Sequence, residues 1–230
     1  AIAATAARLA RDLNAVNYKW NGFCVLHTAA ARVGALDLGA VPAAGAMTAA
    51  EMVQPGALDV LFLLGADEID VPQGAFTVYI GTHGDRGAHR ADVILPGAAY
   101  PEKSGTYVNT EGRVQLAARA AFPPGDARED WAIFRALSDT LGQRLPYDSL
   151  TALRRAMHAA HPHLQQVDEI APGDPSDVER LAARGGTVGK AAFESAVADF
   201  YLTNPIARAS SVMAECSALA EGQQALSAAE

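Results

Sequence analysis

Short apolar runs separated by turn residues dominate the first half of the chain. The run at residues 58–64 is apolar at both odd and even positions, which is typical of a central strand covered on both faces. Residues 76–80 and 93–95 form two further short runs, each followed by glycine or proline. This spacing predicts the last part of a doubly wound parallel α/β sheet, and we expect the first strands of that sheet to lie outside this chain.

Helical periodicity and capping residues predict helices around these strands. Thr48 and Glu51 have the spacing of a capping box, and Asp126 is expected to cap the helix that follows Pro123-Pro124-Gly125. A turn is expected at residues 20–23, around Asn21-Gly22. The longer helices are predicted over residues 2–13, 26–33, 126–143, 150–160 and 210–220.

The last third of the chain has a different character. Residues 168–189 are rich in proline, glycine and charge and are interpreted as a linker. Phe193, Phe200 and Tyr201 follow it, which suggests an anchor lying on another surface; the alternative is a return strand or helix in the same domain. Residues 221–230 are expected to be frayed. The predicted domains are therefore an α/β domain (1–120), a helical segment packing on it (121–165), and a linker with a docking tail (166–230).

Composition excludes several classes of partner. The chain has a net charge of −8 and no cluster of lysine or arginine, which argues against a nucleic-acid partner. It contains no run of about 18 apolar residues, so no membrane-spanning helix is expected. The chain does not begin with methionine, so it is expected to start inside a longer protein, to have been processed, or to be only partly recorded.

Metal-ligating residues are few. Cys24 and Cys216 are far apart, whereas an iron–sulfur cluster needs about four cysteines and a zinc site needs paired ligands. His158, His161 and His163 lie close in sequence, but Pro162 interrupts the helix, so they bind a metal only if the turn brings the rings together. His27 is interpreted as a packed structural residue, since no second ligand lies at helical spacing.

Polar loops follow the predicted strands, where ligands bind in open α/β sheets. Residues 81–87 form a glycine-rich loop that lacks the lysine of a P-loop and the spacing of a dinucleotide fingerprint. Asp67, after the first strand, either faces a ligand or caps the next turn. Residues 102–115 are either a ligand-binding loop or a solvated loop with local ion pairs.

The order ADVILPGAAYPEKSGTYVNTEGRVQ at residues 91–115 resembles a segment shared by molybdopterin oxidoreductases. With residues 79–88, it is similar to one branch of that superfamily, the large iron–sulfur subunit of respiratory complex I (NADH:quinone oxidoreductase). Residues 20–23 with residues 26–30, and residues 204–210, resemble the same subunit. The resemblance covers the C-terminal part of that subunit and none of its cluster-binding N-terminal part.

The resemblance implies a domain that keeps a molybdopterin-oxidoreductase-like fold without holding a cofactor. The iron–sulfur clusters (2Fe-2S and 4Fe-4S) are implied only for the N-terminal part of the parent subunit, and no metal site is expected in this segment. The implied partners are other subunits of the peripheral arm, on the cytoplasmic or matrix side of the inner membrane. The complex itself oxidises NADH, reduces quinone and translocates protons.

Two other functions remain open from the sequence. In an active molybdopterin enzyme, the resemblance would make the polar loop contact the pterin, although the chain is short for so large a cofactor and shows no convincing molybdenum ligand. A free-standing nucleotide-binding module would use residues 81–87. The candidate contacts, vestigial if the domain is structural, are Glu102, Lys103, Thr106, Asn109, Glu111 and Arg113.

Overall fold

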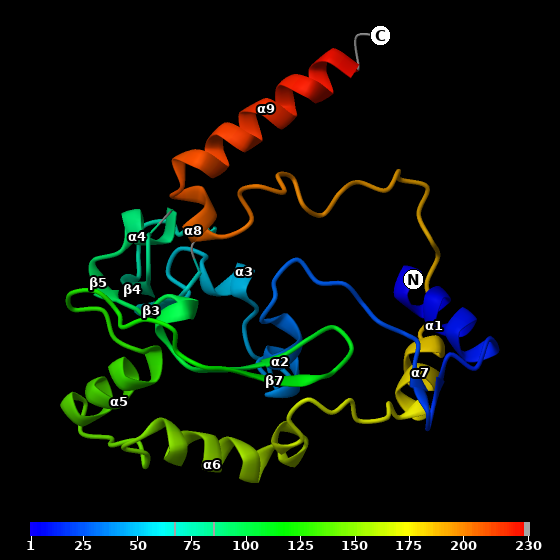
Figure 1. Cartoon of the computed structure of the whole chain (residues 1–230), viewed down its shortest axis with the longest axis horizontal. Coiled ribbons are helices and arrows are strands. Elements are labelled where there is room, and N and C mark those ends of the chain that lie inside the picture. The colour runs from blue at the N-terminus through cyan, green and yellow to red at the C-terminus, as the bar shows by residue number, and fades with distance from the viewer. Residues whose placement is uncertain (67, 85, 228–230) are drawn as a thin grey trace. The chain divides into compact units, whose positions relative to one another are not determined.

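The computed structural model describes residues 1–66, 68–84 and 86–227 of the chain (Figure 1). The chain forms two compact units, and each unit is assembled from three separate stretches of sequence. Unit 1 comprises Ala1–Val41, Thr106–Ala117 and Arg154–Ala196, and unit 2 comprises Pro42–Gly105, Ala118–Leu153 and Val197–Glu230. The division into residues 1–120, 121–165 and 166–230 stays a prediction.

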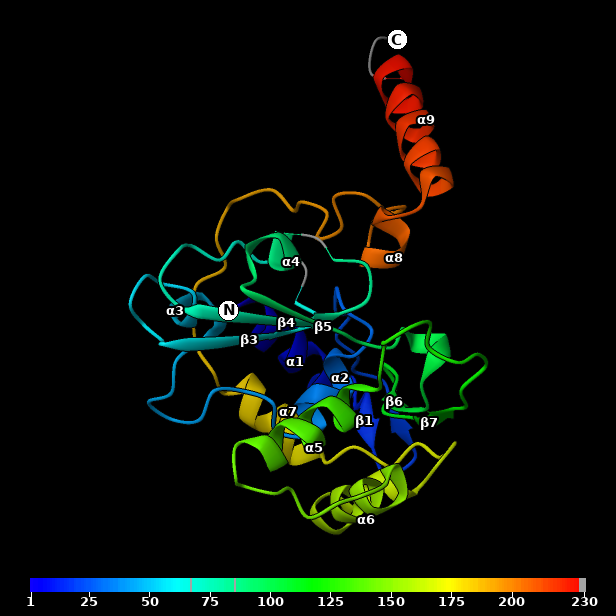
Figure 2. The same ribbon diagram turned by 90° about the vertical axis from the view of Figure 1, so that its left-hand side faces the viewer.

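Unit 2 is organised around a three-stranded parallel sheet, which confirms the predicted mixed α/β architecture (Figure 2). The strands β3 (Val60–Leu64), β4 (Phe76–Gly81) and β5 (Val93–Pro96) pair in that order. The prediction that the first apolar run is the central strand is wrong, because β4 is central and β3 lies at the edge. Apolar composition shows that a strand can be buried, but it does not show which neighbours cover it.

One face of this sheet is packed. Leu61 and Leu63 of β3 and Tyr79 of β4 are buried there and contact Ala88 of α4 (Arg86–Arg90). A Cβ atom on Gly87 would lie 2.6 Å from the carbonyl oxygen of Ala66, so a glycine is required for α4 to approach the end of β3.

The other face of the sheet is only partly covered. Val60, Phe62 and Leu64 alternate with the buried residues of β3 and remain 49%, 42% and 52% exposed. Phe134 of α5 (Asp130–Thr140) contacts Phe62, with ring centroids 6.2 Å apart. A parallel sheet is normally covered on both faces, so this apolar face is incomplete within the described chain.

Helices α3 (Ala49–Met52) and α6 (Leu150–Ala160) form as predicted. The side chain of Glu51 accepts a hydrogen bond from the backbone N–H of Thr48 at 2.7 Å, and the Thr48 hydroxyl accepts one from Glu51, which confirms the capping box. The prediction that Asp126 begins the next helix is wrong, since α5 begins at Asp130. The backbone of Arg128 hydrogen-bonds to Pro96 and Ala98 beside β5, and this pairing keeps it out of the helix.

Unit 1 contains a pair of packed helices, of which the sequence predicted only the first. Helix α1 (Ile2–Asp12) forms as expected and packs against α7 (Pro175–Ala182), which lies within the predicted linker (Figure 1). Asp174 caps α7 by accepting a hydrogen bond from Ser176 N–H at 2.8 Å, and Pro175 occupies the first helical position. Val178 and Ala182 bury their side chains against Ala7 and Ala10, and this packing stabilises the short helix.

The loop before α7 is joined to a small hairpin formed by β1 (Val16–Asn17) and β2 (Trp20–Asn21). The amide group of Asn21 donates to Ala171 O at 2.8 Å, and its oxygen accepts from Gly173 N–H. The predicted turn at residues 20–23 is therefore misplaced, because Trp20 and Asn21 belong to a strand and the turn lies at Tyr18-Lys19.

A second core of unit 1 surrounds the strands β6 (Gly105–Val108) and β7 (Val114–Ala117). Val108, Val114 and Leu164 are buried together, and Val33 of α2 (Arg32–Asp37) packs against them. The helix predicted over residues 26–33 is wrong, since α2 begins at Arg32 and continues through Gly34. The glycine at position 34 suggested that the helix ends there. Instead, Val33 packs against the buried core, and the helix forms around it, from Arg32 to Asp37.

The C-terminal part of unit 2 contains α8 (Pro205–Arg208) and α9 (Ser211–Ser227). The final helix is longer than predicted, because residues 221–227, expected to be frayed, continue it. Residues 228–230 lie outside the described part of the chain, as does Asp67.

The ion pairs that Asp148, in the loop before α6, makes with Arg135 of α5 and with Arg144 predict a loss of stability in acid. Hydrogen bonds from Arg135, at 2.6 Å, and from Arg144 lower the pKa of Asp148 below its ordinary value of 3.8. Its contribution is therefore complete above about pH 4 and is lost as the pH falls through the lowered pKa. We expect Asp148→Asn to be less stable at pH 7 in urea unfolding, with a difference that vanishes near pH 2; Glu215→Gln, an exposed control, should match the wild type at both pH values.

Candidate functional site

A pocket lies at the carboxyl ends of the parallel strands, where open α/β sheets bind ligands. Its volume is about 240 Å³, and all of its walls belong to unit 2. The residues that line it are Leu64, Gly65, Ile80, Gly81, Thr82, Ala98, Lys103, Asp130 and Pro205. The pocket therefore occupies the position of a cofactor crevice, with Lys103 as the one sequence-predicted site residue that lines it.

The charge of Lys103 is matched by a carboxylate of the same unit. Its Nζ donates to Oδ2 of Asp130, in the first turn of α5, at 2.5 Å. The two side chains are only 28% and 29% exposed, so water screens the pair less than it screens a surface ion pair. The Asp130 carboxylate offsets the positive charge of Lys103, which weakens the attraction of this pocket for an anion.

The loop that carries Lys103 is held by its own side chains. Oε2 of Glu102 accepts a hydrogen bond from the N–H of Ala99 at 2.9 Å, and the Ser104 hydroxyl accepts one from Arg119 N–H at 3.3 Å. Glu102 thus stabilises the turn immediately after β5.

The remaining predicted site residues belong to unit 1. Oδ1 of Asn109 accepts hydrogen bonds from the N–H groups of Glu111 and Arg113, both at 3.0 Å, and so holds the turn between β6 and β7. Arg113 donates to the carbonyl oxygen of Asp168 at 2.5 Å and lies 3.8 Å from the Glu111 carboxylate. Thr106 is half-buried in β6.

Five of the six candidate residues therefore direct charged or acceptor groups toward atoms of the same chain. A dinucleotide-sized pterin cofactor needs polar groups that are free to contact it and a ligand for its metal. Each of these five residues already has a partner within the chain.

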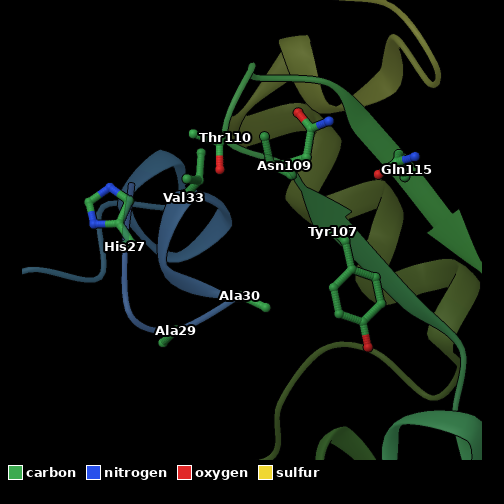
Figure 3. Close-up of a pocket in the computed structure, with 9 residues that line it drawn as sticks. His27, Ala29, Ala30, Val33, Tyr107, Asn109, Thr110 and Gln115 are labelled. Carbon is green, nitrogen blue, oxygen red and sulfur yellow. The ribbon is translucent and has the colours of Figure 1, made fainter. Parts of the chain in front are cut away.

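A second pocket, in unit 1, was missed by the sequence analysis (Figure 3). It has a volume of about 360 Å³, with His27, Ala29, Ala30 and Val33 on one side and residues 107–110 with Gln115 on the other. His27 is exposed at its edge, so the prediction that it is packed is wrong. Both walls belong to segments that carry the family resemblance, but nothing in their spacing indicated that they meet.

The glycine-rich loop, two of whose residues, Gly81 and Thr82, also line the strand-end pocket, and the histidine cluster are the other candidate features. Thr82, His83 and Gly84 of the glycine-rich loop line a pocket of about 310 Å³ next to β5, and Asp85 lies outside the described residues. His163 Nε2 lies 3.4 Å from Oδ2 of Asp37, and the ring centroids of His161 and His163 are 6.3 Å apart. In the described part of the chain, no three His, Cys, Asp or Glu side chains are grouped so that they could hold a metal ion.

Comparison with known families identifies the fold. A model of the molybdopterin oxidoreductases matches residues 1–140, more than half of the chain. The chain belongs to the molybdopterin oxidoreductase family. A second family model, which describes the C-terminal region of the G subunit of NADH-ubiquinone oxidoreductase, matches residues 167–216. This family member therefore has a more specialised segment after its shared α/β part.

The chain is similar to three proteins of eukaryotes. It is 46% identical over 219 residues to the NADH-ubiquinone oxidoreductase 78 kDa subunit of Neurospora crassa, covering 90% of this chain and 28% of that protein. It is 44% identical over 223 residues to the NADH dehydrogenase [ubiquinone] iron-sulfur protein 1 of Solanum tuberosum (95% and 29%). It is 45% identical over 204 residues to the NADH-ubiquinone oxidoreductase 75 kDa subunit of Reclinomonas americana (87% and 29%). The chain thus spans less than a third of the length of these relatives.

The Lys103–Asp130 ion pair is expected to contribute to the free energy of unfolding. Lys103→Ala leaves a partly buried carboxylate without its partner and should lower the free energy of unfolding by about 1–3 kcal/mol. The double variant Lys103→Met/Asp130→Leu should lower the free energy of unfolding by less than the two single changes together, because neither charge is then left without its partner. Urea unfolding provides the measurement.

Asp177→Asn is the control for this experiment. It removes an ion pair with Arg180 whose side chains are 63% and 69% exposed, and it should change stability by about 0–1 kcal/mol. If Lys103→Ala costs no more than this control, the Lys103–Asp130 pair contributes no more to stability than a surface ion pair.

Substitutions of Asn109 test whether this side chain has a structural role in the turn between β6 and β7. Asn109→Ala removes the acceptor of two turn N–H groups and should destabilise the protein by about 1 kcal/mol, whereas Asn109→Asp keeps an acceptor oxygen and should cost less. Thermal unfolding of the purified protein checks this. Equal stability of Asn109→Ala and wild type would show that the turn does not depend on this side chain.

Proposed function

We propose that the chain is a structural, cofactor-free domain of the large iron–sulfur subunit of NADH:ubiquinone oxidoreductase, respiratory complex I. The observation that carries this proposal is the Lys103–Asp130 ion pair, whose two residues line the strand-end pocket. It supports a crevice maintained by the protein's own charges rather than by a ligand. The similarity to complex I subunits over nearly the whole chain supports the placement in that complex.

The amount of exposed surface supports a role in assembly. The chain exposes 15575 Å². A globular monomer of 23.9 kDa exposes about 10,000 Å², and two separate globules of half that mass expose about 12,000 Å². Large apolar side chains contribute to the excess, including Leu26 at 85%, Phe193 at 88% and Leu219 at 69% exposure. Surface of this kind is typical of a subunit that is buried among partners.

In this proposal, the domain supports electron transfer without carrying electrons. The iron–sulfur clusters (2Fe-2S and 4Fe-4S) belong to the rest of the parent subunit, and the complex passes electrons from NADH to quinone. The domain docks against other subunits of the peripheral arm, beside the membrane. Within the described residues, no helix has the length and apolar character needed to cross a bilayer.

An active molybdopterin enzyme is the second candidate, favoured by the match of residues 1–140 to the molybdopterin oxidoreductases. Such an enzyme commonly needs a protein side chain on the metal. Cys24 is the candidate outside the C-terminal tail; it is an exposed free thiol whose Sγ lies 3.7 Å from Asn21 O. This environment does not provide the enclosed site that a metal ligand requires.

Metal analysis of the parent polypeptide distinguishes the two functions. We expect several iron atoms per polypeptide, molybdenum far below one atom per polypeptide, and no pterin fluorescence after oxidative extraction. A molybdoenzyme purified from the same cells is the control, because it shows that the cofactor was available. One molybdenum atom per polypeptide, with extractable pterin, would establish the enzyme and overturn the structural role.

A further inference from the structure

The segment that joins α7 to the α8 region is exposed and irregular. Residues 185–198, here called the arm, belong to no helix or strand in the described structure. The backbone groups of residues 187–193 make no hydrogen bond to any other described residue. The arm therefore presents an extended backbone together with its side chains.

The arm places its largest apolar side chain in solvent. Phe193 is 88% exposed, and Val188 and Val197 are 47% and 41% exposed. Phe200, just beyond the arm, is 79% exposed. Water disfavours such a surface, and an aromatic ring that fills a pocket on a partner is the usual anchor of a protein interface.

The arm continues into a segment that is firmly attached to unit 2. The Asp199 carboxylate accepts hydrogen bonds from the Ser217 hydroxyl and from Tyr201 N–H, the latter at 2.8 Å. Nη1 of Arg208 lies 2.8 Å from Glu68 Oε1. An extended segment fixed at its end keeps its anchor within a limited volume, which reduces the entropy that docking would cost.

Charge indicates which partner chemistry fits the arm. Arg184 and Lys190 are balanced by Glu194 and Asp199, so the arm and its two ends carry no net charge. Binding to nucleic acid or to an anionic membrane surface depends on an excess of basic residues. A neutral apolar socket on a folded protein is the complementary surface.

The position of the arm in the sequence indicates which protein complex contains the partner. The molybdopterin oxidoreductase match ends at residue 140, and the arm lies within residues 167–216, which match the NADH-ubiquinone oxidoreductase segment. The exposed aromatic side chain is therefore part of the segment that distinguishes this chain from the wider family.

We propose that the arm docks on another protein subunit of the same complex, with Phe193 inserted into an uncharged apolar socket of that subunit. This inference rests on the proposed function, since it takes the complex I assembly as the setting.

Photo-crosslinking in the purified complex tests the contact directly. A photoreactive phenylalanine analogue is placed at position 193 of the parent subunit, and the crosslinked peptides are identified by mass spectrometry. We expect one dominant crosslink, to apolar residues of an identified neighbouring subunit. A crosslink to lipid, to the same chain, or to no partner would overturn the proposal.

Substitutions test whether the contact matters for assembly. Phe193→Asp, which places a charge in the apolar socket, should reduce the fraction of parent subunit found in the complex by about tenfold, and Phe193→Leu should remain near wild type. The matched control is Phe122→Asp, an 80% exposed phenylalanine outside residues 167–216 whose ring already contacts the Arg119 guanidinium, 4.4 Å from the ring centroid; this change should leave assembly unchanged.

The outcomes separate the two proposals. Wild-type parent subunit that does not copurify with the complex would overturn the proposed function itself. If wild type and Phe193→Asp copurify with the complex equally, only the docking proposal for the arm is overturned. The same holds if Phe122→Asp reduces assembly as much as Phe193→Asp does. Because Phe193 is almost fully exposed, each variant should keep the thermal unfolding midpoint of the wild type when purified alone.

Discussion

A parallel sheet needs apolar cover on both of its faces, and this constraint governs unit 2. One face of β3–β4–β5 meets it through Leu61, Leu63 and Tyr79 packed against α4. On the other face, α5 reaches Phe62 through Phe134, but the side chains of β3 remain half exposed, and the outer edge of β3 pairs with no described strand. Within the described residues, the sheet is stable on one face and incomplete on the other, which suits a domain that works in contact with other protein surfaces.

The strand-end pocket follows from the same sheet. Parallel strands bring their carboxyl ends to one edge, and the loops there can hold a ligand or hold one another. Here Glu102 accepts from the backbone at Ala99, and Lys103 pairs with Asp130. The polar groups of this loop therefore make contacts within the chain, and these contacts stabilise the loop at this edge of the sheet.

Much of this could be predicted where local chemistry decides the structure. The Thr48–Glu51 capping box, helix α6 and the three strand positions depend on nearby residues and were predicted correctly. The start of α2 and the edge position of β3 depend on contacts with distant residues, such as Val33 with Val108, and periodicity does not report these contacts. Helix α7 is an intermediate case, because Asp174-Pro175 is a recognisable helix start that the surrounding proline and glycine residues concealed.

The candidate site residues stay a prediction, whereas the structure defines the contacts that they make within the chain. The sequence indicated that Glu102, Lys103, Asn109 and Arg113 matter, and each makes a specific contact in the structure. It could not show that the partners are Ala99, Asp130 and Asp168, because those pairs form only after folding. Residues that resemble a cofactor loop can therefore be retained for the turns and ion pairs they make. In this chain Glu102, Lys103, Asn109 and Arg113 of that loop have hydrogen-bond partners within the chain, whereas large apolar side chains such as Phe193 face solvent, and exposed apolar surface of this kind is typical of protein–protein contacts.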